Sequence, residues 1–234
     1  MPTRTAVEEF TDRIHAQWLP EYCADVNRNY SLDGFKNSSI RLTEIDAADC
    51  LRAISHEVVI DEGGGRYVAP RSAAREVMFW EGLKATSPRP ITLWIEPVIT
   101  MAAAARLHLN HGWPKDVIGL QSKRWGFDFV AYQSAKSDVL LIAGEVKKTE
   151  RELTKLVSEL RFLSHTACYG DAETPQVSQN TRNKWNEILI SQPCVFWALG
   201  PGAKGYVFEI SYPSQGVAAF SETNVTSLNC ANAA

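Results

Sequence analysis

The stretch "LIAGEVKKTEREL", residues 141–153, decides the fold. An apolar run typical of a buried strand ends in Glu145, and Lys147 and Lys148 follow at once. Side chains on a strand alternate between its two faces, so Glu145 and Lys147 share one face while Val146 lies on the other. A charged helical pattern begins directly afterwards, which places a carboxylate and an amine together at the end of the strand.

A second predicted strand carries a carboxylate among apolar residues. "GFDFVAY", residues 126–132, contains Asp128 in surroundings where an unpaired charge is costly. If residues 133–138 form a hairpin loop, the two strands are antiparallel neighbours and Asp128 lies near Glu145. Two close carboxylates repel each other, and a divalent cation with oxygen ligands would relieve that repulsion. With Lys147 beside them, the set suits metal-assisted hydrolysis of a phosphodiester.

The elements around these strands predict an α/β protein with a mixed central β-sheet flanked by helices. An alanine-rich helix is expected before them, and an amphipathic helix with leucines on one face is expected after them. The expected order is a helix over 96–114, strands over 116–124, 126–134 and 137–147, helices over 149–165 and 175–191, and strands over 194–200 and 205–212.

Residues 1–90 predict an N-terminal α+β region, and "TSPRP" at 86–90 is taken as its boundary. Its role is target choice, dimerisation or contact with a partner. Residues 216–234 are expected to form a C-terminal tail. The elements expected before the boundary are a helix over 5–19 ended by Pro20, a helix over 44–57 with Asp46 as N-cap, a hairpin over 57–70 turning at Gly63, Gly64 and Gly65, and a helix over 71–85.

The pattern over roughly residues 91–210 resembles the PD-(D/E)XK nuclease superfamily. The resemblance is carried by Asp128 in "GFDF", by Glu145 and Lys147 in "GEVK", by a preceding helix with Glu96 and by the amphipathic helix that follows. It implies a restriction-endonuclease-like core over residues 91–215. The residue before Asp128 is phenylalanine where the family name has proline, a position at which the family varies.

The resemblance implies a Mg²⁺-dependent endonuclease, with Mn²⁺ as a substitute metal. Asp128, Glu145 and the carbonyl of Val146 would be metal ligands, and Lys147 would orient or activate the attacking water. Glu96 would be an outer carboxylate, although Pro97 after it places it at the helix entrance or before a kink. The expected substrate is nucleic acid, DNA in preference to RNA, in phage or mobile-element defence or in DNA processing.

Four basic residues are candidates for nucleic-acid binding. Lys123 and Arg124 precede Asp128, and with Trp125 they would contact a phosphate backbone and a base. Lys148 and Arg151 lie at the start of the charged helix. For Lys148 and Arg151 the alternative is a solvated helix face, because acidic residues alternate with the basic ones along that helix. For Lys123 and Arg124 the alternative is a strand end with ordinary exposed basic residues.

Other interpretations of the carboxylates stay open. Glu145 and Lys147 alone would make a same-face ion pair on a solvated strand, and Asp128 would then be an edge or turn residue. Glu96 would be an acidic residue favoured by the helix N-terminus. At the level of function, the alternatives are a catalytically silent nucleic-acid-binding or assembly module with the same fold, and an unrelated α/β protein.

Composition excludes several classes. The formal net charge is −3, so any positive surface for nucleic acid must be local. Five scattered cysteines indicate neither a disulfide framework nor a zinc ribbon. The sequence shows no signal peptide and no membrane-spanning run, so a cytoplasmic protein without a membrane partner is expected. Four tryptophans in apolar patterns are expected in the core, namely Trp80, Trp94, Trp185 and Trp197.

Overall fold

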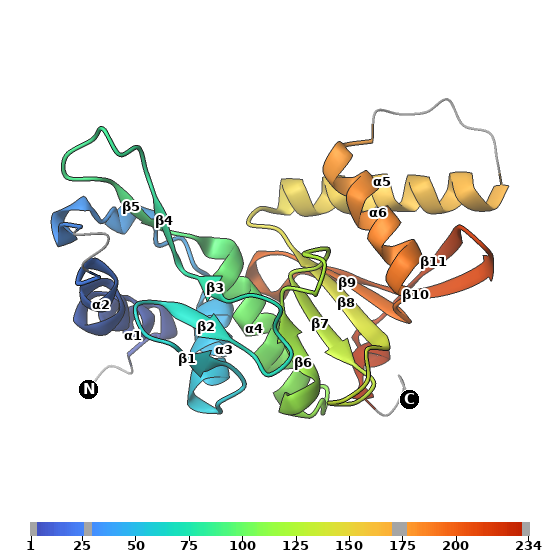
Figure 1. Cartoon of the computed structure of the whole chain (residues 1–234), viewed down its shortest axis with the longest axis horizontal. Helices are drawn as coiled ribbons and strands as arrows, with labels where there is room; N and C mark the ends of the chain where they lie inside the picture. Colours follow the sequence, from blue (N-terminus) through green and yellow to red (C-terminus); the bar gives the residue numbers. More distant parts are fainter. Residues whose placement is uncertain (1–3, 26–29, 170–176, 231–234) are drawn as a thin grey trace.

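The computed structural model describes residues 4–25, 30–169 and 177–230. The chain has an α/β fold built on a six-stranded mixed sheet of order β11-β10-β9-β8-β7-β6 (Figure 1). Neighbouring strands are antiparallel, except that β8 and β9 are parallel. The strands are β6 (Ile118–Leu120), β7 (Phe129–Tyr132), β8 (Leu140–Val146), β9 (Val195–Leu199), β10 (Gly205–Ser214) and β11 (Val217–Thr223).

Helices cover both faces of this sheet. Helix α4 (Ile95–Leu109) packs on one face, and α5 (Glu150–Tyr169) and α6 (Gln179–Ser191) lie together on the other (Figure 1). The alternation of side chains along β7 divides the core accordingly. Phe129 lies in the cluster on the α4 side, whereas Val130 lies in the cluster with α5 and α6. The predicted order of helices and strands over this part of the chain is therefore confirmed.

The β7–β8 hairpin, which the sequence predicts, holds the two candidate strand carboxylates side by side. Phe129 pairs with Gly144, so Asp128 directly precedes this pair on one strand and Glu145 directly follows it on the other. A Cβ atom on Gly144 would come within 2.0 Å of the Phe129 ring. Glycine is therefore required at this position, because the ring lies directly over the β8 backbone just before Glu145.

The N-terminal part combines helices with two small antiparallel sheets. The elements are α1 (Ala6–Arg13), a π-helical turn (Ile14–Trp18), α2 (Leu19–Cys23), α3 (Glu44–Ser55), the sheet of β1 (Ile60–Asp61), β2 (Arg66–Val68) and β3 (Glu76–Val77), and the sheet of β4 (Phe79–Glu81) and β5 (Ile91–Leu93). Short 3-10 turns occur at Leu32–Gly34, Asn37–Ser39, Lys115–Val117, Pro201–Ala203 and Val225–Leu228. The β1–β2 hairpin with its glycine turn confirms the prediction.

The helix predicted over 71–85 is wrong, because this stretch supplies β3 and β4. Its local helix propensity is overridden by pairing with β2 and β5, which lie elsewhere in the sequence. Residues 86–90 consequently lie in the loop of the β4–β5 hairpin. Residues 217–223, which were expected in the C-terminal tail, form the edge strand β11 against β10.

Two helix boundaries also differ from expectation. Pro20 does not end the first helix, because the π-helical turn before it lets Leu19 donate to Ile14 and Pro20 sits in the first turn of α2. The N-cap of α3 is Thr43 rather than Asp46. Asp46 lies in the first turn, where it is buried and accepts a hydrogen bond from the Thr43 hydroxyl at 2.8 Å.

One cluster of buried apolar side chains connects the N-terminal elements with α4 and the main sheet. It includes Trp18 and Tyr67 from the N-terminal part and Phe129 and Trp197 from the main sheet. Trp185 and Trp197 are buried as predicted, whereas Trp80 and Trp94 are exposed, so that part of the prediction is wrong. No helix in the described ranges is long and apolar enough to cross a membrane.

Candidate functional site

Glu145 is a buried carboxylate held between two lysines. It lies near the end of β8 and is only 4% exposed. Lys147 donates from Nζ to Glu145 Oε1 at 2.6 Å, and Lys184 of α6 forms an ion pair with Oε2. Val146 is buried in the cluster on the α4 side, so Glu145 and Lys147 share the opposite face as the alternation predicts. The interpretation of this pair as a solvated strand surface does not hold for Glu145.

Asp128 lies against the same strand, just before β7. Its Oδ2 accepts a hydrogen bond from the backbone N–H of Val146 at 2.7 Å, and its own N–H donates to the Gly144 carbonyl. Burial, followed by the negative charge of Glu145, raises the pKa of Asp128 to about 8; the positive charge of Lys184 and the Val146 N–H act in the opposite direction. The two carboxylates are therefore close enough to repel each other strongly.

Lys147 is held in its charged form. Burial lowers its pKa, but the negative charges of Glu145, Asp128 and Glu96 and the hydrogen bond to Glu145 outweigh burial, so the pKa is raised from the ordinary lysine value. A lysine with a raised pKa remains an ammonium group near neutral pH. Lys147 can therefore stabilise negative charge or orient a water molecule, but it is a poor proton acceptor.

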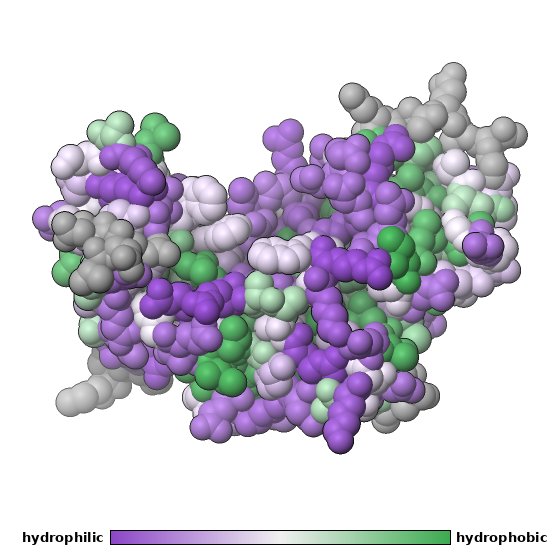
Figure 2. Space-filling view, in the orientation of Figure 1, coloured by the Kyte–Doolittle hydropathy of each residue, from purple (hydrophilic) through white to green (hydrophobic). Residues whose placement is uncertain are grey.

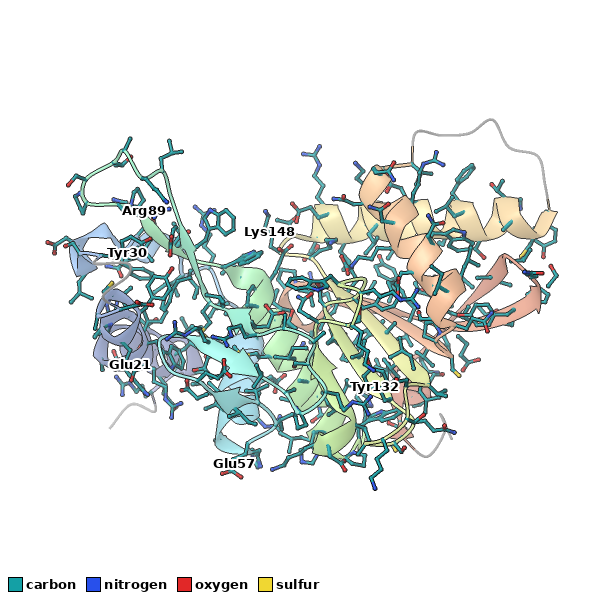
Figure 3. The ribbon with its side chains drawn as sticks, viewed as in Figure 1. Glu21, Tyr30, Glu57, Arg89, Tyr132 and Lys148 are labelled. Atoms are coloured by element: carbon teal, nitrogen blue, oxygen red, sulfur yellow. The ribbon has the colours of Figure 1, made fainter. Side chains whose placement is uncertain are left out.

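Glu145, Lys147 and Lys184 open into a cavity of about 590 Å³ beside the start of α5. Its polar lining includes Glu96, Glu145, Lys147 and Lys184. Figure 2 shows that the surface is indented between the β4–β5 hairpin and α5, and Figure 3 shows Lys148, next to Lys147, on this side of the molecule. The site therefore combines the buried carboxylate of Glu145 with access from solvent.

Glu96 lies in the first turn of α4, with Trp94 as N-cap, and lines the cavity. The Trp94 indole N–H donates to Glu96 Oε2 at 3.1 Å. Pro97 follows within the first turn, so Glu96 is at the helix entrance rather than before a kink. Burial raises the pKa of Glu76, a carboxylate on β3, to about 6. The negative charge of Glu96 contributes to this rise.

None of the four basic candidates is among the residues that line the cavity containing Glu145. Lys123 forms an ion pair with Asp138 at 2.6 Å, and together with Arg124 it lines a different cavity of about 300 Å³. Lys148 forms an ion pair with Glu152 at 3.8 Å. Arg151 is exposed on the first turn of α5.

Lys184 is the site residue that sequence reasoning missed. It reaches Glu145 from α6 and also donates to the Gly126 carbonyl just before Asp128. It stands far from Glu145 in the sequence, in a helix whose polar residues look like an ordinary solvated face. Only the packing of α6 over this end of the sheet brings it to the carboxylates. Glu76 was also missed, because its strand was expected to be a helix.

Among the described residues, no three histidine, cysteine, aspartate or glutamate side chains cluster so as to hold a metal ion. Two carboxylates, those of Asp128 and Glu145, face each other, and one of them is already neutralised by lysines. The donor chemistry nevertheless fits a hard divalent cation, because such cations prefer carboxylate oxygens and would relieve the repulsion between these two groups, which adds to burial in raising the pKa of Asp128.

The raised pKa of Asp128 predicts how the stability of the metal-free protein depends on pH. Asp128 binds its proton more tightly in the folded state, with a pKa of about 8, than in the unfolded state, where the ordinary value is 3.8. The free energy of unfolding should therefore decrease as pH rises between these two values and level off above them. Urea denaturation in a chelator should show this decrease in wild type and a smaller one in Asp128→Asn. An equal decrease in both proteins would contradict the assignment.

Comparison of the chain with models of known protein families, with curated proteins and with solved structures finds no match. Any assignment of function therefore depends on the side chains described above.

Proposed function

We propose that this protein is a metal-dependent nuclease with a restriction-endonuclease-like core, which hydrolyses phosphodiester bonds in nucleic acid, DNA in preference to RNA. The observation that supports the proposal most is the position of Glu145. A buried carboxylate that faces a second carboxylate across a hairpin, and that contacts two ammonium groups, is expensive to maintain for stability alone. Such a group is a functional-site candidate because it lines an open cavity.

Asp128, Glu145 and the carbonyl of Val146 would hold Mg²⁺, with Mn²⁺ as a substitute. The metal would supply an acidified water and positive charge for the phosphate. Lys147 and Lys184 would stabilise the negative charge that develops on the phosphoryl oxygens. Glu96, oriented by the Trp94 indole, would hold a water molecule at the cavity entrance.

The experiment is a cleavage assay on supercoiled plasmid, linear duplex and single-stranded DNA, with Mg²⁺, with Mn²⁺ or with a chelator. Wild type should cut only with metal. Asp128→Asn, Lys147→Met and Lys184→Met should each lower the rate by about 10²- to 10³-fold, the usual effect of removing one group that stabilises transition-state charge. Lys155→Met is the matched control, since Lys155 lines the same cavity but pairs with Glu159 at 3.8 Å and is largely exposed. It should cut at nearly the wild-type rate.

Two outcomes would contradict the proposal. If wild type cuts and the Asp128 and Lys147 variants cut equally well, the activity belongs to other residues. If wild type binds nucleic acid without cutting it under any metal condition, and calorimetry detects no Mn²⁺ binding that Asp128→Asn removes, the catalytically silent module is the better description.

A further inference from the structure

Three tryptophans beside the candidate site are exposed instead of buried. Trp80 is 60% exposed, Trp94 is 37% exposed and Trp125 is 68% exposed. Trp80 belongs to β4, Trp94 directly follows β5, and Trp125 lies in the turn between β6 and β7. A single exposed aromatic residue needs no explanation. Here Trp125 lines the cavity and Trp94 is hydrogen-bonded to Glu96, which also lines it, so the exposed rings suggest a binding surface.

Trp80 and Trp94 form a pair on the outer face of the hairpin. Phe79 of β4 points into the core, so Trp80 points outward, where it pairs in register with Thr92. Trp94 follows Thr92 by two positions and therefore lies on the same face. The two indole rings meet edge to face, with centroids 5.5 Å apart. Because the Trp94 N–H is bonded to Glu96, the ring is held in one orientation.

Arg89, in the loop of the β4–β5 hairpin, stabilises the hairpin that supports this pair. Its Nε donates to the Gly82 carbonyl at 2.8 Å, and its guanidinium forms an ion pair with Glu81 at 3.1 Å. Arg89 and Tyr30 also contact each other, the guanidinium lying 5.1 Å from the ring centroid (Figure 3). The tryptophans therefore sit on a fixed support and not on a loose loop, which lowers the entropic cost of binding.

The backbone conformation of Trp125 is a second, independent indication that this residue has a function. Its φ is 60°, a left-handed conformation that is unfavourable for a bulky residue. The turn is held by its N–H, which donates to the Ser122 carbonyl at 2.8 Å, and by the Ser122 hydroxyl, which accepts from Gly126. Burial of the side chain does not offset the free-energy cost of this conformation, because the side chain is exposed. Strain of this kind is retained where the side chain has a task.

The aromatic surface continues into the cavity. Glu96, which holds Trp94, and Trp125 both line the cavity that contains Glu145 and Lys147. The charged groups of the cavity wall nearly cancel, since four glutamates and three lysines line it. Attraction of phosphates by charge is therefore modest here, and aromatic stacking offers binding energy that does not depend on a basic groove.

We propose that Trp80, Trp94 and Trp125 form a stacking surface for unpaired bases, which delivers single-stranded nucleic acid to the cavity. The proposal rests on the proposed nuclease function and names its substrate as a single-stranded segment. Indole rings stack on any base, so the surface accepts a strand with little sequence preference. In a duplex the bases are stacked on one another and unavailable, so duplex binding gains nothing from these rings.

The test measures binding by fluorescence anisotropy in a chelator, so that cleavage does not interfere. The probes are fluorescein-labelled oligothymidylate and oligouridylate of about 20 nucleotides, longer than typical single-strand sites, and a DNA duplex of the same length. Wild type should bind the single strands more tightly than the duplex, with quenching of tryptophan fluorescence and a shallow salt dependence. Trp80→Ala and Trp125→Ala should each weaken single-strand binding about ten-fold or more, and Trp80→Phe should restore most of it.

Two further variants separate stacking from structural effects. Trp125→Gly removes the strained side chain, so it should raise the melting temperature while it weakens single-strand binding. Tyr169→Ala is the matched control, because Tyr169 is 77% exposed at the far end of α5 and should leave binding unchanged.

The proposal is overturned if Trp80→Ala and Trp125→Ala bind single strands as tightly as wild type, or if the duplex binds equally well. It is also overturned if wild type is a dimer that Trp80→Ala converts to monomers without a change in binding, since the rings would then cover a second copy. Failure of the nuclease proposal looks different: tryptophan-dependent binding would persist without cleavage.

Discussion

Replacement of Glu145 by glutamine is expected to lower the rate of phosphodiester cleavage by about 10³-fold, at the upper end of the effect of one electrostatic group. Glutamine keeps the shape of the side chain but removes its charge. Lys147 and Lys184 then lose the carboxylate that positions both ammonium groups, and the proposed metal loses a ligand. Steady-state cleavage of single-stranded DNA with Mg²⁺ measures the effect.

A second readout does not depend on activity. The charge of Glu145 contributes to the raised pKa of Asp128, after burial itself. Glu145→Gln should therefore reduce the decrease in stability that the metal-free protein shows with rising pH. Glu150→Gln is the control, because Glu150 is exposed and pairs with Lys204 on the surface. An active Glu145→Gln variant with an unchanged pH dependence would rule out the site as described.

The largest expected effect on stability comes from Arg106 in α4. Its side chain is 5% exposed and binds two carboxylates of α3, with Nε 2.7 Å from Asp49 and Nη2 2.8 Å from Asp46. Asp46 also accepts the Gly202 N–H at 2.6 Å, which links α3 to the turn between β9 and β10. Arg106→Met should reduce the free energy of unfolding by about 3–5 kcal/mol, because it leaves the buried carboxylate of Asp46 without a cation and that of Asp49 with only the partly exposed Arg52.

Arg52 provides a matched comparison for Arg106. It also pairs with Asp49, at 3.0 Å, but its side chain is 45% exposed. Arg52→Ala should therefore cost about 1 kcal/mol or less. Urea denaturation of both variants tests the contrast. Similar decreases in the free energy of unfolding would show that burial does not determine how much these ion pairs contribute to stability. Adding Asp46→Asn and Asp49→Asn to Arg106→Met should recover part of the stability, since no buried charge then lacks a partner.

The Arg106 network also supports the candidate site. Helix α4 begins at Ile95, so its first turn carries Glu96 into the cavity, while the Arg106 ion pairs anchor its last turn to α3. Arg106→Met would then disturb the position of Glu96 as well as the stability. The two ends of one helix thus serve different purposes, one holding the fold together and the other entering the site.

The α/β class and the placement of Asp128, Glu145 and Lys147 were predictable because they depend on short-range rules. An apolar run of strand length, the alternation of faces and a hairpin-sized loop are local features. They suffice to place Asp128 beside Glu145, and the register of Phe129 with Gly144 agrees with that. The amphipathic helix α5 follows from its leucine spacing in the same way.

The errors arose where strand partners outside a stretch decide its local structure. Residues 71–85 have an alanine- and arginine-rich pattern suited to a helix, yet strands β3 and β4 form because β2 and β5 offer them hydrogen-bond partners. Trp80 and Trp94 resemble core residues in sequence. Their exposure follows from the orientation of the hairpin, which spacing alone does not reveal.

The sequence by itself determined the strand pair, the E-x-K end of β8 and the face that its charges share, because the chemistry of neighbouring residues sets them. Only the tertiary structure decided that Lys184 meets Glu145, that Glu76 lies near Glu96 and that Trp125 lines the cavity while Trp80 and Trp94 are exposed. These contacts join residues far apart in the chain. Their formation depends on how α4, α6 and the hairpin pack against the end of the sheet, where burial and charge balance select the arrangement.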